Sequence, residues 1–156
     1  MEWTESIVVD RPVDVVHAAV ADENVLMRWS AWPAATGYTC SVEGDGRSIG
    51  SCIVFRDTDG VEQGRQRLER VSDDRVEYRL TNRGPGGRVL HPEVDFRLEP
   101  LGEARTRVHL DFRNDLPLPP LVRQVVGTLL ARRVRALHVK DLQDLKAHVE
   151  SRPVAR

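Results

Sequence analysis

The sequence predicts an α+β domain. A seven-stranded, curved antiparallel sheet wraps around one long C-terminal helix, and two short helices lie between the first two strands. Three observations favour this arrangement. From Leu118 to Glu150 apolar residues recur at helical spacing, and proline occurs only at the start. Much of residues 37–113 alternates apolar with polar side chains, as half-buried strands do. Turn-forming pairs such as Asp45-Gly46 divide that region into hairpins.

Composition limits the classes of function. The chain has 156 residues, which suits a single domain, 1–156, with a sizeable core. Its net charge of −1 gives no overall field that would attract nucleic acid. Apolar runs fall short of the ~18 residues of a membrane span, and no signal-peptide core follows Met1, so we expect no stable membrane insertion and a cytoplasmic location. Cys40 and Cys52 fall on opposite faces of the predicted sheet and are expected to stay reduced.

The N-terminal elements follow from local signals. Ser6–Asp10 contains consecutive β-branched residues and is expected to form the first strand, with a start as early as Trp3 left open. Pro12 ends this strand and begins a short helix, because its fixed φ suits a first helical turn. Asp22 can cap a second short helix that continues to Trp32 and ends at Pro33.

Turn positions set the register of the first hairpins. A two-residue turn centred on Asp45-Gly46 would pair Val42 with Ile49. A second turn at Asp59-Gly60 places Gln66 on the apolar face of the sheet.

The later strands need one irregularity. The strand after the Asp73-Asp74 turn is out of register with its predecessor by one residue, so we expect a β-bulge near Glu69–Arg70. A loop at Gly102–Ala104 closes the last hairpin and pairs Phe96 with Leu110 on the inner face. The outer face of this hairpin is charged and solvated.

Several motifs resemble those of the START-like SRPBCC superfamily, and more closely its polyketide cyclase/dehydrase and lipid-transport group. Residues Ile7 to Asp22, followed by Trp29, match its strand and proline-led helix, although His17 stands where members often carry an aromatic residue. The hairpin around Phe96–Gly102 and the long final helix also match. The resemblance implies a helix-grip fold that binds hydrophobic small molecules. Some members are cyclases or aromatases, some carry lipids or quinones, and some resemble activators of the Hsp90 ATPase.

A curved sheet around one helix leaves an apolar space that is the expected binding site. Its few inward polar groups would orient the ligand. The residues expected to line it are Trp29, Trp32, Tyr38, Ser51, Phe55, Gln66, Tyr78, Phe96, Phe112, Val122 and Val126.

Three functions remain open. The first is binding or transport of a polyketide-, lipid- or quinone-like molecule. The second is a cyclase/dehydrase-type enzyme in which Tyr78 polarises a carbonyl group and His91 moves the proton. The third is a protein-interaction or chaperone-cofactor module, whose apolar surface would come from the second half of the long helix. The five histidines lack metal-ligand spacing, so we expect no metal and no cofactor, in a monomer or homodimer.

The longest irregular connection between strands, Asn82–His91, is rich in glycine. We expect it to form a mobile lid over the site together with the first helical turn near Pro119–Val122.

Overall fold

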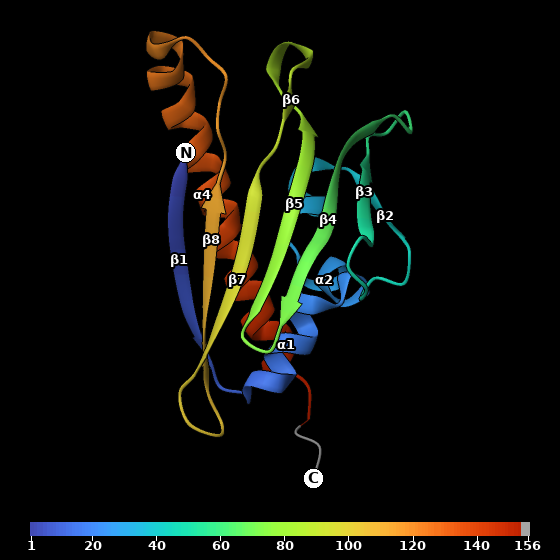
Figure 1. Ribbon diagram of the computed structural model, residues 1–156, viewed down its shortest axis with the longest axis vertical. Helices are drawn as coiled ribbons and strands as arrows, with labels where there is room; N and C mark the ends of the chain where they lie inside the picture. The colour runs from blue at the N-terminus through green and yellow to red at the C-terminus, as the bar shows by residue number, and fades with distance from the viewer. Residues whose placement is uncertain (154–156) are drawn as a thin grey trace.

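The computed structural model describes residues 1–153 and confirms the predicted α+β architecture (Figure 1). One antiparallel sheet has the strand order β1-β8-β7-β5-β4-β3-β2, and the two-residue β6 pairs with the end of β5. The strands are β1 (Glu2–Val9), β2 (Thr39–Glu43), β3 (Cys52–Arg56), β4 (Glu62–Ser72), β5 (Arg75–Arg83), β6 (Val89–Leu90), β7 (Glu93–Pro100) and β8 (Thr106–Arg113).

The helices cover one side of this sheet. Figure 1 shows α4 running behind the sheet along β1 and β8, while α1 and α2 lie at the end where the chain terminates. The helices are α1 (Val13–Ala21), α2 (Glu23–Trp29), α3 (Trp32–Thr36) and α4 (Pro120–Glu150), with a short 3₁₀ turn, η1 (Pro85–Gly87), before β6.

Three helices, not two, connect β1 to β2. The predicted second helix is wrong beyond Trp29, because Ser30 takes an extended backbone conformation that ends α2. Pro33 does not end a helix but lies in the first turn of α3, where its missing N–H needs no partner. The first strand begins at Glu2, one residue before the earlier of the two predicted starts, and pairs with β8 along its whole length.

Most of the predicted strand pairings are confirmed. Ile53 pairs with Gln66, and Phe96 pairs with Leu110. The register of β4 against β5 shifts between Leu68 and Arg70, which is the predicted β-bulge.

The predicted register of the first hairpin is wrong. Val42 pairs with Ile53 instead of Ile49, so the connection is longer than a two-residue turn. The Asp45 side chain accepts backbone hydrogen bonds within this loop, and the Gly46 carbonyl accepts one from the N–H of Glu23 in α2 at 2.8 Å. These bonds hold the loop against α2. The change from Ile49 to Ile53 is an even step, so the predicted inner and outer faces of the strands are unchanged.

The two halves of α4 have roles opposite to the predicted ones. We expected any exposed apolar surface of this helix to come from its second half. Instead Leu142, Leu145 and Val149 of the second half are buried in the core, whereas Gly127 is the one buried residue between Pro120 and Leu129. The first turns of α4 project past the start of β1 in Figure 1, so the sheet gives them little to cover.

Candidate ligand-binding site

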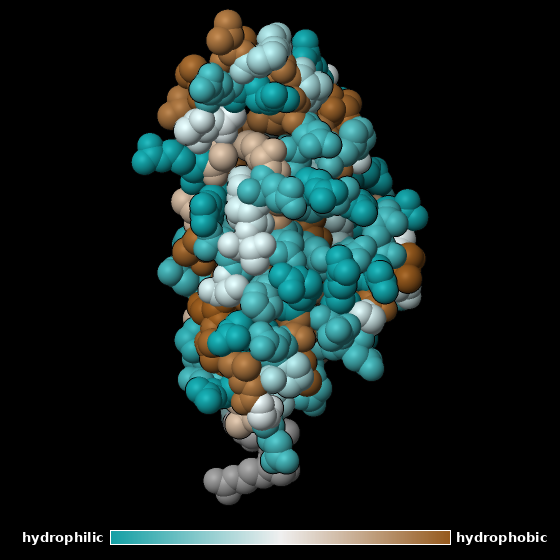
Figure 2. All heavy atoms as spheres, turned by 60° about the vertical axis from the view of Figure 1, so that its left-hand side comes forward, coloured by the Kyte–Doolittle hydropathy of each residue, from teal (hydrophilic) through white to brown (hydrophobic). Residues whose placement is uncertain are grey.

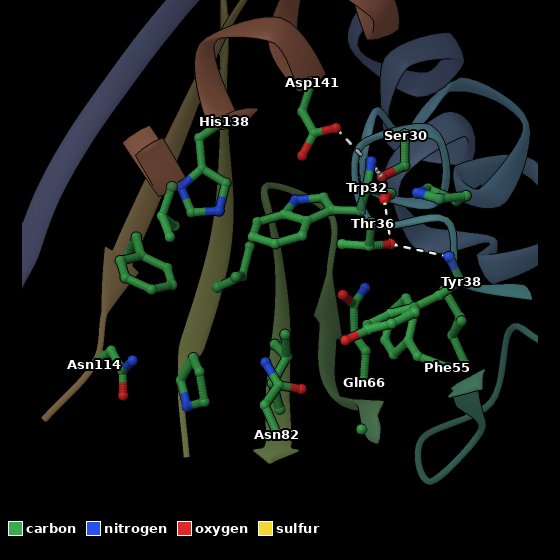
Figure 3. A pocket seen from close by; sticks show the side chains of 18 of the residues that line it. Ser30, Trp32, Thr36, Tyr38, Phe55, Gln66, Asn82, Asn114, His138 and Asp141 are labelled. Atoms are coloured by element: carbon green, nitrogen blue, oxygen red, sulfur yellow. Dashed lines mark hydrogen bonds between the residues drawn. The ribbon is translucent and has the colours of Figure 1, made fainter. Parts of the chain in front are cut away.

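A cavity of about 350 Å³ lies between the inner face of the sheet, helices α2 and α3, and the middle of α4. This volume falls within the range of pockets that hold small molecules, roughly 300–1,000 Å³. Seven of the predicted residues line it and supply most of its aromatic wall: Trp29, Trp32, Tyr38, Phe55, Gln66, Phe96 and Phe112. Figure 3 shows the Trp32 indole reaching across the space between α4 and the sheet.

Two of the predicted polar residues are committed elsewhere and do not line the cavity. Tyr78 is fully buried, and its hydroxyl donates to the Val20 carbonyl at 2.7 Å. Burial raises the pKa of the Tyr78 phenol well above its ordinary value, which keeps the group neutral. The Ser51 hydroxyl accepts from the Gly46 N–H at 2.8 Å and stabilises the loop after β2.

The other predicted residues outside the lining are exposed. His91 lies between β6 and β7 and faces solvent, although its neighbours Leu90 and Pro92 line the cavity. Val122 and Val126 lie in the exposed first half of α4. Two other apolar residues further along the same helix, Leu130 and Val134, line the cavity instead of them.

His138 is a lining residue that the sequence did not reveal. The Trp3 indole N–H donates to its Nδ1 at 3.2 Å. Because an indole nitrogen can only donate, Nδ1 must be the lone-pair nitrogen and the proton of the neutral ring lies on Nε2. Burial lowers the pKa of His138 to about 4, so the ring is neutral near pH 7. In Figure 3 the nitrogen on the far side of the ring from β1 points toward the Trp32 side of the cavity. His138 therefore offers one N–H donor to a ligand.

Asp141, one turn further along α4, is the second polar group in this part of the wall. Its Oδ1 accepts hydrogen bonds from the Ala31 N–H at 2.7 Å and from the Ser30 hydroxyl at 3.2 Å, which anchors the connection between α2 and α3. Burial raises the pKa of Asp141 to about 6 although these bonds favour the ionised form. The second oxygen is directed toward the Trp32 indole and the cavity in Figure 3. The carboxyl group can thus exchange a proton near neutral pH.

Further polar groups lie away from α4. Gln66, Asn82 and Asn114 line the cavity, and the three are drawn at the same end of Figure 3. The side-chain oxygen of Asn114 is buried and has no hydrogen-bond partner among the residues described. A buried acceptor without a partner costs about 1–3 kcal/mol. Because almost none of the surface of this oxygen is accessible, it offers no acceptor to a ligand in the cavity.

Within residues 1–153, no group of three or more His, Cys, Asp or Glu side chains is arranged to hold a metal ion. No helix in the same part of the chain is long and apolar enough to cross a membrane.

A curved sheet that holds a long helix over a largely apolar cavity defines a ligand-binding helix-grip fold. The chain belongs to the family described as polyketide cyclase / dehydrase and lipid transport, whose sequence profile matches residues 1–150. This confirms the resemblance drawn from its motifs. No curated protein sequence matches the chain.

Solved structures share the fold at low sequence identity. Norcoclaurine synthase from Thalictrum flavum superposes with a TM-score of 0.70 at 11% identity, over 97% of this chain and 87% of that one. Protein CV1439 from Chromobacterium violaceum gives 0.68 at 17% identity, over 97% and 98% of the two chains. A conserved protein from Geobacillus kaustophilus gives 0.68 at 14% identity, over 96% and 95%.

Proposed function

We propose that the protein binds a hydrophobic small molecule of the polyketide, lipid or quinone type in this cavity. The observation that carries the proposal is the wall itself, in which aromatic and aliphatic side chains surround about 350 Å³ of space. Apolar surface removed from water contributes roughly 25 cal/mol per Å². A ligand that buries about 300 Å² of such surface would gain about 7 kcal/mol before the costs of association.

The polar groups on α4 narrow the chemistry of the ligand. The Nε2–H of His138 suits a carbonyl or ether oxygen, and Asp141 can accept a hydrogen bond from a hydroxyl group. The two residues lie one helical turn apart, so both can contact the same end of a molecule. The preferred ligand is therefore an apolar body with oxygen substituents at one end.

Calorimetric titration tests this proposal with two matched compounds, 1,4-naphthoquinone and naphthalene, which share a ring system and differ in the carbonyl groups. Both should bind saturably, and the quinone should bind more tightly. Replacing His138 by phenylalanine removes the N–H donor, and we expect quinone affinity to fall about 5–30-fold while naphthalene affinity changes little. His109→Gln, on the outer face of β8, is the control. Failure of both compounds and of longer polyketides and fatty acids to bind would refute the proposal.

A second candidate function, a cyclase/dehydrase-type enzyme, is favoured by one observation. Asp141, whose pKa is about 6, and the neutral His138 lie together in an apolar cavity, and such a pair can move protons at neutral pH. We propose these two residues for the roles first considered for Tyr78 and His91. The cavity would hold a flexible polyketone in one reactive conformation.

Turnover of a polyketone surrogate tests the enzymatic proposal. Asp141→Asn and His138→Phe should each lose most of the activity, whereas Tyr78→Phe and His91→Ala should retain it. Loss of activity in the second pair with retention in the first would reverse the assignment.

A further inference from the structure

The first half of α4 carries apolar side chains that nothing in the structure covers. Leu121 is 81% exposed, and Val125 and Leu129 are each 65% exposed. These three positions follow one another at intervals of four, so they form a single stripe along the helix. Val122 and Val126 lie beside it and are also exposed. Figure 2 shows brown, apolar atoms gathered at the end of the molecule from which these turns project. A contiguous surface of this kind marks an interaction site.

The same part of the helix is cationic. No Asp or Glu occurs between Asp115 and Asp141, whereas arginine or lysine occurs at positions 123, 132, 133, 135 and 140. Arg135 pairs with Glu5 and Lys140 with Asp144, but no ion pair in the described part of the chain involves Arg132 or Arg133. These two arginines follow Leu129 by three and four positions, so they stand one turn below the apolar stripe, on the same side of α4.

This surface adjoins the cavity. Leu130 and Val134, on the neighbouring side of the same helical turns, line the cavity wall. Arg83 at the end of β5 and Gly84 directly after it also line the cavity. The side chain of Arg88, just before β6, donates to the Pro117 carbonyl just before α4. The exposed apolar stripe and this side of the cavity wall are therefore parts of one end of the fold.

We propose that the first half of α4 docks on an anionic lipid bilayer. Leu121, Val125 and Leu129 would enter the region between headgroups and acyl chains, while Arg132 and Arg133 contact the headgroup phosphates. The contact is superficial, because the helix lies on the bilayer and does not span it. The chain as a whole has a net charge of −1, so the attraction to an anionic bilayer comes from the local positive charge of Arg132 and Arg133.

Charge argues for lipid in preference to a second copy of the chain. A second copy docked through the same face would present no acidic side chain of its own first half of α4 to Arg132 and Arg133, because no Asp or Glu occurs between Asp115 and Asp141. An anionic bilayer supplies the missing negative charge. Docking on a bilayer does not depend on the identity of the cavity ligand. Docking could also let a ligand pass between the bilayer and the cavity, and that step alone rests on the proposed function.

Vesicle sedimentation with the full chain, free of added ligand, tests the inference. Vesicles of phosphatidylcholine with about 30 mol% phosphatidylserine should bind the protein, and about 0.5 M salt should release much of it. Pure phosphatidylcholine vesicles should bind it at least about tenfold more weakly.

Variants locate the surface. The triple variant L121Q/V125Q/L129Q should lose at least about tenfold in partitioning, and R132Q/R133Q should lose the preference for phosphatidylserine. Glutamine is a good helix former, so α4 should persist, as circular dichroism can verify. The matched control is I49Q/V61Q, which changes two exposed apolar residues elsewhere and should bind like the wild type.

Three results would overturn the inference: no partitioning onto either vesicle, equal partitioning of the triple variant and the wild type, or a dimer in light scattering that the triple variant abolishes without any vesicle binding. The triple variant should bind 1,4-naphthoquinone like the wild type in calorimetry, because none of its three changed residues lines the cavity. This measurement separates a failure of bilayer docking from a failure of ligand binding.

Discussion

Replacing Asp141 by asparagine should make the protein more stable at neutral pH and leave its stability in acid nearly unchanged. The carboxyl group is buried, and its pKa is about 6 in the folded protein against an ordinary value of 3.8. A folded-state pKa raised in this way favours the folded state most below pH 3.8. As the pH rises through 6, folding increasingly requires a buried charge, and that advantage is lost.

The size of this effect follows from the two pKa values. Their difference, 6 − 3.8 = 2.2 units, corresponds to about 3 kcal/mol at roughly 1.4 kcal/mol per unit. Asparagine keeps an oxygen that can accept the hydrogen bonds from the Ala31 N–H and the Ser30 hydroxyl, so the anchor between α2 and α3 should survive. The free energy of unfolding of Asp141→Asn should therefore exceed that of the wild type by up to about 3 kcal/mol above pH 7 and by little near pH 4.

Urea unfolding followed by circular dichroism at several pH values between about 4 and 8 measures this difference. Asp144→Asn is the control, because Asp144 lies one turn away, is partly exposed and pairs with Lys140 at the surface. Its effect should be the loss of one surface ion pair, about 0–1 kcal/mol. A difference between Asp141→Asn and the wild type that stays constant across this range would refute the reasoning, since it would show that Asp141 titrates alike in the folded and unfolded chains.

Three further predictions concern single side chains. Tyr78→Phe leaves the Val20 carbonyl without its donor and should lower the free energy of unfolding by about 1–3 kcal/mol in urea titrations, with ligand affinity unchanged in calorimetry. Glu23 is fully buried, and burial raises its pKa, so Glu23→Gln should stabilise the fold at pH 7 and less so in acid, as thermal melts at both pH values can show. Arg88→Gln removes the contact with the Pro117 carbonyl and should speed ligand exchange in stopped-flow fluorescence more than it weakens affinity; equal rates would place the route elsewhere.

The Arg88 variant tests the predicted lid better than substitution of the glycines in the same loop would. Alanine at Gly86 and Gly87 would probe the loop only if neither residue needed a positive φ, but their φ angles are 72° and 74°. A Cβ at either position would strain the backbone whether or not the loop gates the cavity. Substitution of Arg88 does not require such a backbone change. Glutamine keeps the side chain polar and removes its charge.

Most of the hairpin registers could be predicted because each depends on neighbours in sequence. The turn at Asp59-Gly60 and the alternation from Glu93 to Arg113 determine their own pairings. The predicted register of the first hairpin was wrong because its loop is held by α2, through the hydrogen bond from the Glu23 N–H to the Gly46 carbonyl. No pattern within the hairpin sequence reveals such a contact. Phe55, Phe96 and Phe112 of the cavity wall could be predicted for a similar reason, since inward-facing positions of a strand follow from its period of two.

The polar end of the cavity was missed although the sequence contains a signal for it. In the buried part of α4, His138 and Asp141 interrupt the series Val134, Leu142 and Leu145 at helical spacing. A polar residue within a buried stripe requires a partner, and two such residues one turn apart indicate a polar site. What the sequence does not contain is the identity of their partners, because Trp3 lies at the other end of the chain.

The drift of the apolar stripe along α4 explains both the cavity and the exposed surface. A helix that packed along its whole length would keep its apolar residues on one side. In α4 the second half keeps Leu142, Leu145 and Val149 toward the core, whereas the first half turns Leu121 and Val125 to solvent. Between them Gly127 lies buried near Leu116 of the chain that precedes α4. The same lack of coverage that leaves space for a ligand beneath the middle of α4 therefore leaves its first turns free to bind a partner.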